Sequence, residues 1–212
     1  LVEKQVNDAV ASLIDADLEL AKQVRAADTE INRMEVSIDE ECIRILARRQ
    51  PAASDLRLII GISKSVIDLE RIGDEATKIA KRTLQLSEDG AAPRGYDEIR
   101  HIGAQVRRMV QEALDAFARF DVDLALAVSQ YDKTIDREYK SALRELVTYM
   151  MEDPRSISRV LSVIWVLRSL ERIGDHARNI AELVEHMVHG TDARHKSLLP
   201  SKSADEPADT PE

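Results

Sequence analysis

The sequence contains a single cysteine, Cys42, so no disulfide can form within the 212-residue chain. Its longest apolar run, from Leu161 to Leu167, is far shorter than the ~20 residues that a membrane-spanning helix needs. Aromatic residues make up only 3% of the chain, and its seven glycines and six prolines leave room for long helices. We therefore expect an all-α protein located in the cytoplasm.

Basic residues are too few to balance the acidic ones, which gives a formal net charge of -9. Because nucleic-acid binding depends on neutralising phosphates, this balance argues against DNA or RNA as a partner. The sequence also has no glycine-rich loop of the kind that cradles phosphates, and Cys42 lies on an apolar helical stripe. No enzymatic activity is therefore predicted.

What the chain does contain is an internal repeat. The six residues LERIGD stand at Leu69 to Asp74 and again at Leu170 to Asp175, at an offset of 101 residues. Self-similarity of this kind indicates a duplicated architecture. The two halves should therefore share one fold.

Apolar residues at helical spacing predict three helices in each half. In the first half we expect a helix over residues 1–24 interrupted at 15–17, a second through Ile31 and Ile45 that stops before Pro51, and a third from about Ser54 to Glu88. The second half repeats this spacing, with Pro154 in the place of Pro51 and a last helix over about 156–189.

The segment Glu88 to Gly95 is rich in helix-breaking residues and marks the boundary between the halves. The prediction is two tandem three-helix bundles, over residues 1–89 and 90–190. A polar segment with several prolines follows over 191–212, and its composition predicts a disordered tail.

Acidic residues lie beside the apolar stripes of the second and third helix in each half, on the sides that face each other in an antiparallel pair. Asn32 and Glu70 are equally far along the chain from Pro51, so they should lie at similar positions along the axis of the helix pair. We expect two groups, the first made of Asp28, Asn32, Glu35, Glu70 and Asp74, and the second of Asp132, Asp136, Glu171 and Asp175.

Two interpretations of these groups remain open. Acid pairs four residues apart are common on solvated helix faces. However, like charges at this spacing repel, and acids from a second helix at the same height add to the repulsion. A bound cation would offset it, and all-oxygen sites suit hard cations such as Mg²⁺, Ca²⁺, Mn²⁺ or iron.

The tandem motif ERIGD, at Glu70 to Asp74 and Glu171 to Asp175, on the third helix of two similar three-helix units, resembles the PhoU family. The resemblance implies a cytoplasmic negative regulator of the phosphate regulon. Such proteins couple the Pst phosphate transporter, through its ATPase subunit PstB, to the sensor kinase PhoR. By this resemblance the protein reaches the membrane only through its partners, and we also expect a homodimer.

Some members of the family bind multinuclear iron or zinc clusters, so the resemblance also implies metal cofactors, with manganese or magnesium as alternatives. The implied ligands are the acids of the two motifs, with acids of the preceding helix as partners: Glu70, Asp74, Glu171 and Asp175, then Asp28, Asn32, Asp132 and Asp136. Asn32 departs from an all-acid pattern, and Tyr139 stands where the first half has Glu35. We therefore expect the two sites to differ in affinity or nuclearity.

Two other functions are considered. A ferritin-like di-iron protein needs a Glu-x-x-His motif on each of two helices, and only Glu98 to His101 matches. The other is a helical scaffold that binds no metal, which only a metal assay separates from the metal-binding interpretation.

Positions at which the two repeats differ indicate surfaces that belong to one half alone. Trp165 points away from the apolar stripe of the last helix, beside Leu161, and its counterpart in the first half is Lys64. We expect Trp165 to contribute to self-association or to docking a partner, the alternative being that it packs against the first half. Gly73 and Gly174 lie on the core stripes, where close approach of a neighbouring helix is expected.

Overall fold

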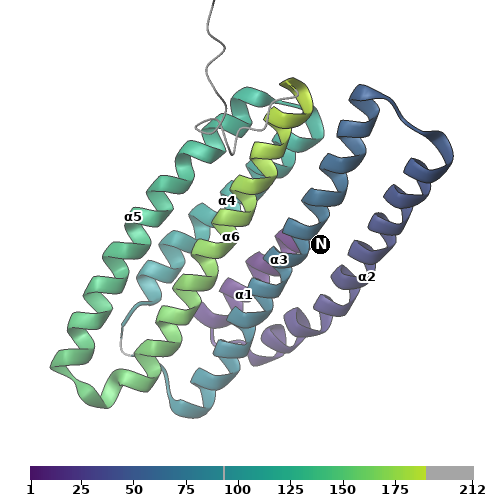
Figure 1. Ribbon diagram of the computed structural model, residues 1–212. Coiled ribbons are helices and arrows are strands. Elements are labelled where there is room, and N and C mark those ends of the chain that lie inside the picture. Colours follow the sequence, from purple (N-terminus) through teal and green to yellow (C-terminus); the bar gives the residue numbers. More distant parts are fainter. Residues whose placement is uncertain (93, 190–212) are drawn as a thin grey trace, which may run out of the picture.

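The structure, a computed structural model, describes residues 1–92 and 94–189 of the chain. Within these ranges the protein is all-α, as predicted, and consists of six α-helices and a short 3₁₀ helix (Figure 1). The elements are α1 (Val2–Ile14), α2 (Leu18–Arg49), α3 (Ala53–Asp89), α4 (Tyr96–Arg119), α5 (Val122–Glu152), η1 (Pro154–Ser156) and α6 (Ile157–His189).

The first helices differ from the prediction in their boundaries. The interruption at residues 15–17 is present, but α2 then continues without a break from Leu18 to Arg49. The Asp17 carboxylate starts this helix by accepting hydrogen bonds from the backbone N–H groups of Glu19 and Leu20, each 3.0 Å long. Asp121 caps α5 in the same way. The predicted first helix was therefore too long, because residues 18–24 belong to α2.

The connection between the repeats runs from Gly90 to Gly95, inside the segment predicted as the boundary. Both glycines have positive φ angles, +87° and +100°, which other residues adopt only with strain. The predicted tail, 191–212, lies outside the described residues.

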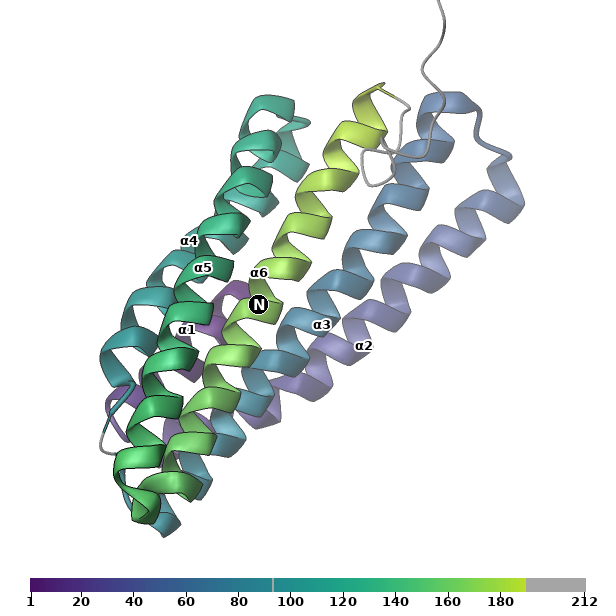
Figure 2. The same cartoon turned by 60° about the vertical axis from the view of Figure 1, so that its left-hand side comes forward.

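Helices α3 and α6 form the centre of the molecule. They pack against each other most extensively, α1 and α4 cover them on one side, and α2 and α5 lie at the flanks (Figures 1 and 2). Because α1 and α4 also touch each other, the two three-helix units share one hydrophobic core. The repeats are thus fused through their central helices.

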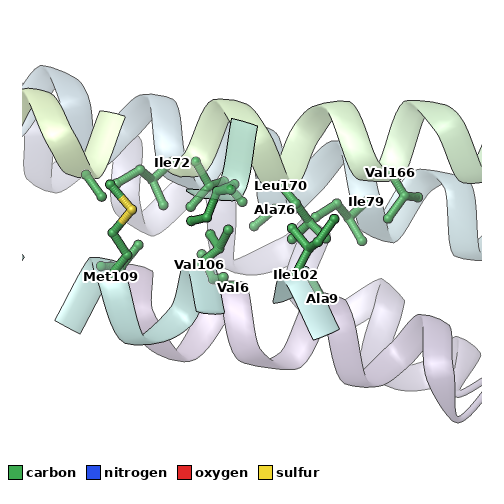
Figure 3. Packing of buried hydrophobic residues seen from close by; sticks show 14 of the residues in the cluster. Val6, Ala9, Ile72, Ala76, Ile79, Ile102, Val106, Met109, Val166 and Leu170 are labelled. Carbon is green, nitrogen blue, oxygen red and sulfur yellow. The ribbon is translucent and has the colours of Figure 1, made fainter. Parts of the chain in front are cut away.

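Fully buried side chains from both units interlock in this core (Figure 3). Ile72 and Ile79 of α3 meet Leu170 of α6, while α1 and α4 contribute residues such as Val6 and Ile102. Burying each of these side chains stabilises the fold by roughly 1.5–3 kcal/mol. The core therefore holds α2 and α5 at fixed positions beside α3 and α6, where the acidic groups lie.

The two motif glycines differ in how closely a neighbour approaches. A Cβ atom added to Gly73 would lie 3.0 Å from Oε1 of Gln5 and 3.4 Å from Cδ1 of Ile31. At Gly174 the nearest atom would be Oδ1 of Asp132 at 3.6 Å, an ordinary contact. Close approach is therefore confirmed at Gly73 and absent at Gly174.

Cys42 is buried, as expected of a small apolar side chain, and burial raises the pKa of its thiol. Over the described ranges, no helix is both long enough and apolar enough to cross a bilayer.

Candidate functional site

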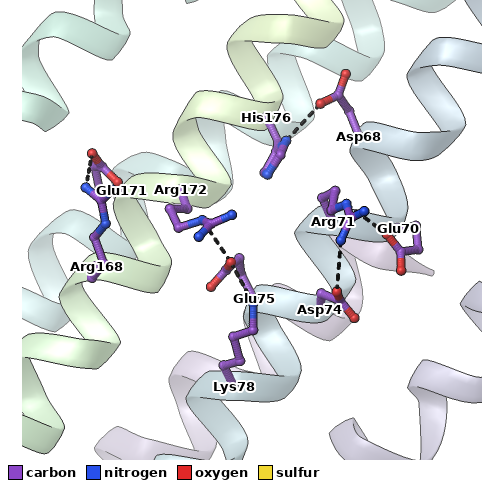
Figure 4. A network of polar contacts seen from close by, with 10 residues as sticks. All are labelled: Asp68, Glu70, Arg71, Asp74, Glu75, Lys78, Arg168, Glu171, Arg172 and His176. Carbon is purple, nitrogen blue, oxygen red and sulfur yellow. Dashed lines mark hydrogen bonds and ion pairs between the residues drawn. The ribbon is translucent and has the colours of Figure 1, made fainter.

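The first acidic group lies between α2 and α3. Burial raises the pKa of Glu70, the nearby Asp74 carboxylate raises it further, and Glu35 and Asp28 of α2 add smaller contributions. The carboxylates of Asp74, Glu35 and Asp28 are therefore close enough to Glu70 to repel its charge. Arg71 opposes the effect, because its Nε lies 3.5 Å from Oε2 of Glu70 and its Nη1 lies 3.8 Å from Oδ2 of Asp74 (Figure 4).

The remaining members of this group differ in their surroundings. Asp28 accepts a hydrogen bond of 3.1 Å from the hydroxyl of Thr77, which in turn accepts one of 3.3 Å from the amide of Gln5 on α1. Asn32, by contrast, is exposed on α2. The group is thus anchored to α1 through Asp28.

The second acidic group lies between α5 and α6 and is more deeply buried. Burial raises the pKa of Glu171, and the carboxylates of Asp175, Asp136 and Asp132 raise it further. One carboxylate oxygen of Glu171, Oε1, lies 2.8 Å from Arg168. The other, Oε2, is buried and has no hydrogen-bond partner. An oxygen in this position is a candidate ligand for a cation.

A cation supplied by the chain itself occupies part of the second group. Arg178 donates a hydrogen bond to the buried Asp132, and it lies 3.2 Å from Asp175 and 3.5 Å from Glu182. Burial nevertheless raises the pKa of Asp132, because it outweighs the attraction of Arg178. Arg178 was not predicted as part of this group. Its spacing from two acids of α6, three residues after Asp175 and four before Glu182, is nevertheless that of helical ion pairs.

The counterpart of Arg178 in the first half is Thr77, so the two acidic groups are not equivalent. The first has only the half-exposed Arg71 at its edge, whereas the second already contains a guanidinium. This difference comes in addition to the replacement of an acid by Asn32.

The fit of these groups to metal ions follows from their donors. Among the residues that the structure describes, no three His, Cys, Asp or Glu side chains converge as a ready-made metal site. The donors are nonetheless all oxygen atoms, they repel one another, and Oε2 of Glu171 lacks a partner. These features fit a hard cation. Arginines already neutralise part of the charge in both groups, Arg71 in the first and Arg178 in the second.

Polar contacts between α3 and α6 were also missed by the sequence analysis. The Nε of Arg172 lies 3.0 Å from the buried carboxylate of Glu75 (Figure 4). His176 is mostly buried, and its Nδ1 lies 2.8 Å from Oδ1 of Asp68. These contacts join the two units, and they depend on a helix register that a single helical wheel does not contain.

Other candidate residues lie apart from both groups. His101 is exposed and lies 3.3 Å from Glu138, so the Glu98 to His101 pair does not form half of a di-iron site. Trp165 is 55% exposed, which confirms that it points outward. The first unit does contact it, because the guanidinium of Arg82 lies 5.9 Å from the ring centre.

Comparison with known proteins agrees with this architecture. The PhoU domain model matches residues 1–83 and 99–184. The chain is 79% identical over 198 residues to a phosphate-specific transport system accessory protein PhoU homolog from Pseudomonas putida, covering 93% of this chain and 77% of that protein. It is 44% identical over 211 residues to PhoU from Escherichia coli K12, covering 97% of this chain and 87% of the relative.

The solved structures give the same result. The crystal structure of PhoU from Pseudomonas aeruginosa superposes with a TM-score of 0.88 at 78% sequence identity, covering 90% of this chain and 91% of the other. A PhoU domain occurs in each half, and the relatives are named as accessory and regulatory proteins of a non-enzymatic family, which sets the ferritin-like di-iron alternative aside. The chain therefore belongs to the PhoU family of phosphate-specific transport accessory proteins.

Proposed function

We propose that this protein is a cytoplasmic negative regulator of the phosphate regulon that couples the Pst transporter, through PstB, to the sensor kinase PhoR. The observation that carries the proposal is the match of both halves to relatives named for phosphate-specific transport. The protein reaches the membrane through these partners and acts as a homodimer.

The architecture suits such a coupling role. An adaptor between two different partners needs two different surfaces on a body that keeps them in fixed relation. The shared core of α1, α3, α4 and α6 provides the body. The halves provide different surfaces, because Arg178, Asn32 and Trp165 each lack an identical counterpart in the other repeat.

Deletion of the gene tests the regulatory proposal. In phosphate-rich medium the deletion strain should express a phosphate-starvation reporter, and a plasmid copy of the gene should restore repression, whereas an empty plasmid should not. Unchanged reporter expression in the deletion strain would contradict the proposal.

We further propose that the two acidic groups hold metal ions, iron or zinc before manganese or magnesium. The residues that would hold them are Glu70, Asp74, Asp28, Asn32 and Glu35 in the first half, and Glu171, Asp175, Asp132 and Asp136 in the second. A bound cation would supply the positive charge that offsets repulsion among these carboxylates. The raised pKa of Glu70 in the first group and of Glu171 in the second, each caused by burial and by the neighbouring carboxylates, supports this proposal together with the unpartnered Oε2 of Glu171.

Elemental analysis of the purified protein tests the metal proposal. Glu70→Ala with Asp74→Ala should lower the metal content, and Glu171→Ala with Asp175→Ala should remove what remains. Glu30→Ala with Glu40→Ala, which removes two exposed acids from α2 outside the group, is the matched control and should leave the metal content unchanged. Wild-type protein that stays metal-free after incubation with excess Fe²⁺ or Zn²⁺ would contradict the metal proposal and favour a helical scaffold that binds no metal.

A further inference from the structure

A surface groove lies where the C-terminal part of α3 meets the N-terminal part of α6. Its volume is about 310 Å³. We call it the basic groove, and it is lined by Lys78, Lys81, Arg82, Gln85, Trp165 and Ser169.

The cations of the basic groove are largely uncompensated. Lys78 lies 2.9 Å from Glu75, but Lys81 has no ion-pair partner in the described part of the chain. Arg82 has no acidic partner there either, since it donates a 2.6 Å hydrogen bond to Gln85 and covers one face of Trp165. Two cations without an acidic partner among the described residues therefore stand together on a protein of net charge -9, so this groove attracts negative charge.

An apolar ridge borders the groove on α6. Ile157, Leu161 and Trp165 follow one another at intervals of four residues, and they are 41%, 41% and 55% exposed. Side chains at this spacing share one helix face. A half-exposed tryptophan beside aliphatic residues has the composition of a binding anchor.

The duplication provides an internal comparison. At the equivalent place in the other repeat, Lys64 replaces Trp165, Asp68 replaces Ser169 and Glu182 replaces Lys81. Asp68 is already engaged there by His176 and by a 3.1 Å hydrogen bond from Asn179. The basic groove is therefore not a consequence of the fold, because the same backbone carries a different surface on the other side.

We propose that the basic groove docks an acidic segment of a partner protein, one that carries apolar side chains among its carboxylates. The carboxylates pair with Lys81 and Arg82, and an apolar side chain of the segment packs on Trp165 and Leu161. This site extends the proposed function, since it concerns a partner's chemistry, and it does not depend on the acidic groups that would hold metal.

The tryptophan reports on this site directly, because Trp165 is the only one in the chain. The probe is a synthetic peptide of sequence EELEELEE, with QQLQQLQQ as its uncharged match. The acidic peptide should shift Trp165 emission in a saturable way, with an affinity that falls as salt is added. Lys81→Gln with Arg82→Gln should weaken binding by about tenfold. Lys64→Gln, an exposed lysine of α3 outside the groove, should bind as the wild type does.

Several results would overturn the proposal. Equal binding of both peptides, or equal binding by the Lys81→Gln, Arg82→Gln variant with unchanged circular dichroism, would show that the cations do not recognise the probe. A change in Trp165 emission and in molar mass together, as the protein alone is concentrated, would make the groove an interface between copies. If only a chain truncated after His189 bound the peptide, the occupant of the groove in the full chain would be the acidic segment that follows Lys202, and not a partner protein.

Discussion

Replacing Gly174 by alanine should stabilise the protein, whereas the same change at Gly73 should not, although both glycines occupy the same place in the LERIGD motif. Each lies inside a long helix, where alanine is favoured over glycine by about 1 kcal/mol. The outcome therefore depends on the space available to the added methyl group.

At Gly174 that space exists. The ideal Cβ position lies 3.6 Å from Oδ1 of Asp132, 3.7 Å from Cδ1 of Ile135 and 3.8 Å from Sδ of Met109, all ordinary contact distances. The methyl group displaces nothing, so the free energy of unfolding should rise by about 0.5–1 kcal/mol.

At Gly73 the same methyl group meets a fixed neighbour. The Cβ position lies 3.0 Å from Oε1 of Gln5, which is buried and donates hydrogen bonds from its Nε2 to the carbonyl of Val24 and to Thr77. Moving Gln5 would weaken both hydrogen bonds, each worth about 0.5–1.5 kcal/mol. This loss cancels or exceeds the gain in helix propensity, so Gly73→Ala should be neutral or destabilising by about 1 kcal/mol.

Urea unfolding followed by circular dichroism measures both changes. The two variants should differ by about 0.5–2 kcal/mol, with Gly174→Ala the more stable. Equal shifts for the two variants would refute the argument that Gln5 and α1 make the repeats inequivalent at this position.

Two further predictions concern the second acidic group. Arg178→Gln should lower the free energy of unfolding by about 3 kcal/mol, because it leaves the buried Asp132 without its cation; in urea unfolding the exposed control Arg137→Gln should match the wild type, and an equal loss in both would count against the role of Arg178. In protein freed of metal by a chelator, Glu171→Gln should stabilise the fold at neutral pH, because burial and neighbouring carboxylates raise the pKa of Glu171, so that its ionised form disfavours folding. This advantage over the wild type should be complete above the raised pKa, shrink as the pH falls through it, and vanish below the ordinary value of 4.5; unfolding curves that show the same advantage at every pH would contradict it.

Much of the fold could be predicted because it is encoded locally. Pro51 and Pro154 end helices wherever they occur, Asp17 caps a helix through its own carboxylate, and the repeat shows that what holds for one half holds for the other. The outward direction of Trp165 followed from the apolar stripe of one helix. The prediction ended one helix at Val24 and began the next near Ile31, whereas α2 runs through both residues. No proline or glycine lies between them to interrupt the helix.

The contacts that could not be predicted all join distant elements. Two of these contacts are the ion pair of Arg172 with Glu75 and the contact of His176 with Asp68. They depend on the axial register between α3 and α6, which the helical wheel of a single helix does not determine. Arg178 is different, since its spacing from Asp175 was visible in the sequence. It was missed because the acids alone were followed around the helix.

The most direct test of the account is whether this protein binds both the transporter ATPase and the kinase. Biolayer interferometry with the immobilised full chain, against purified PstB and the purified cytoplasmic part of PhoR in separate runs, measures this. Saturable binding to each partner is expected. Binding to neither, by a chain with the expected helical circular dichroism, would contradict its role as the link between them.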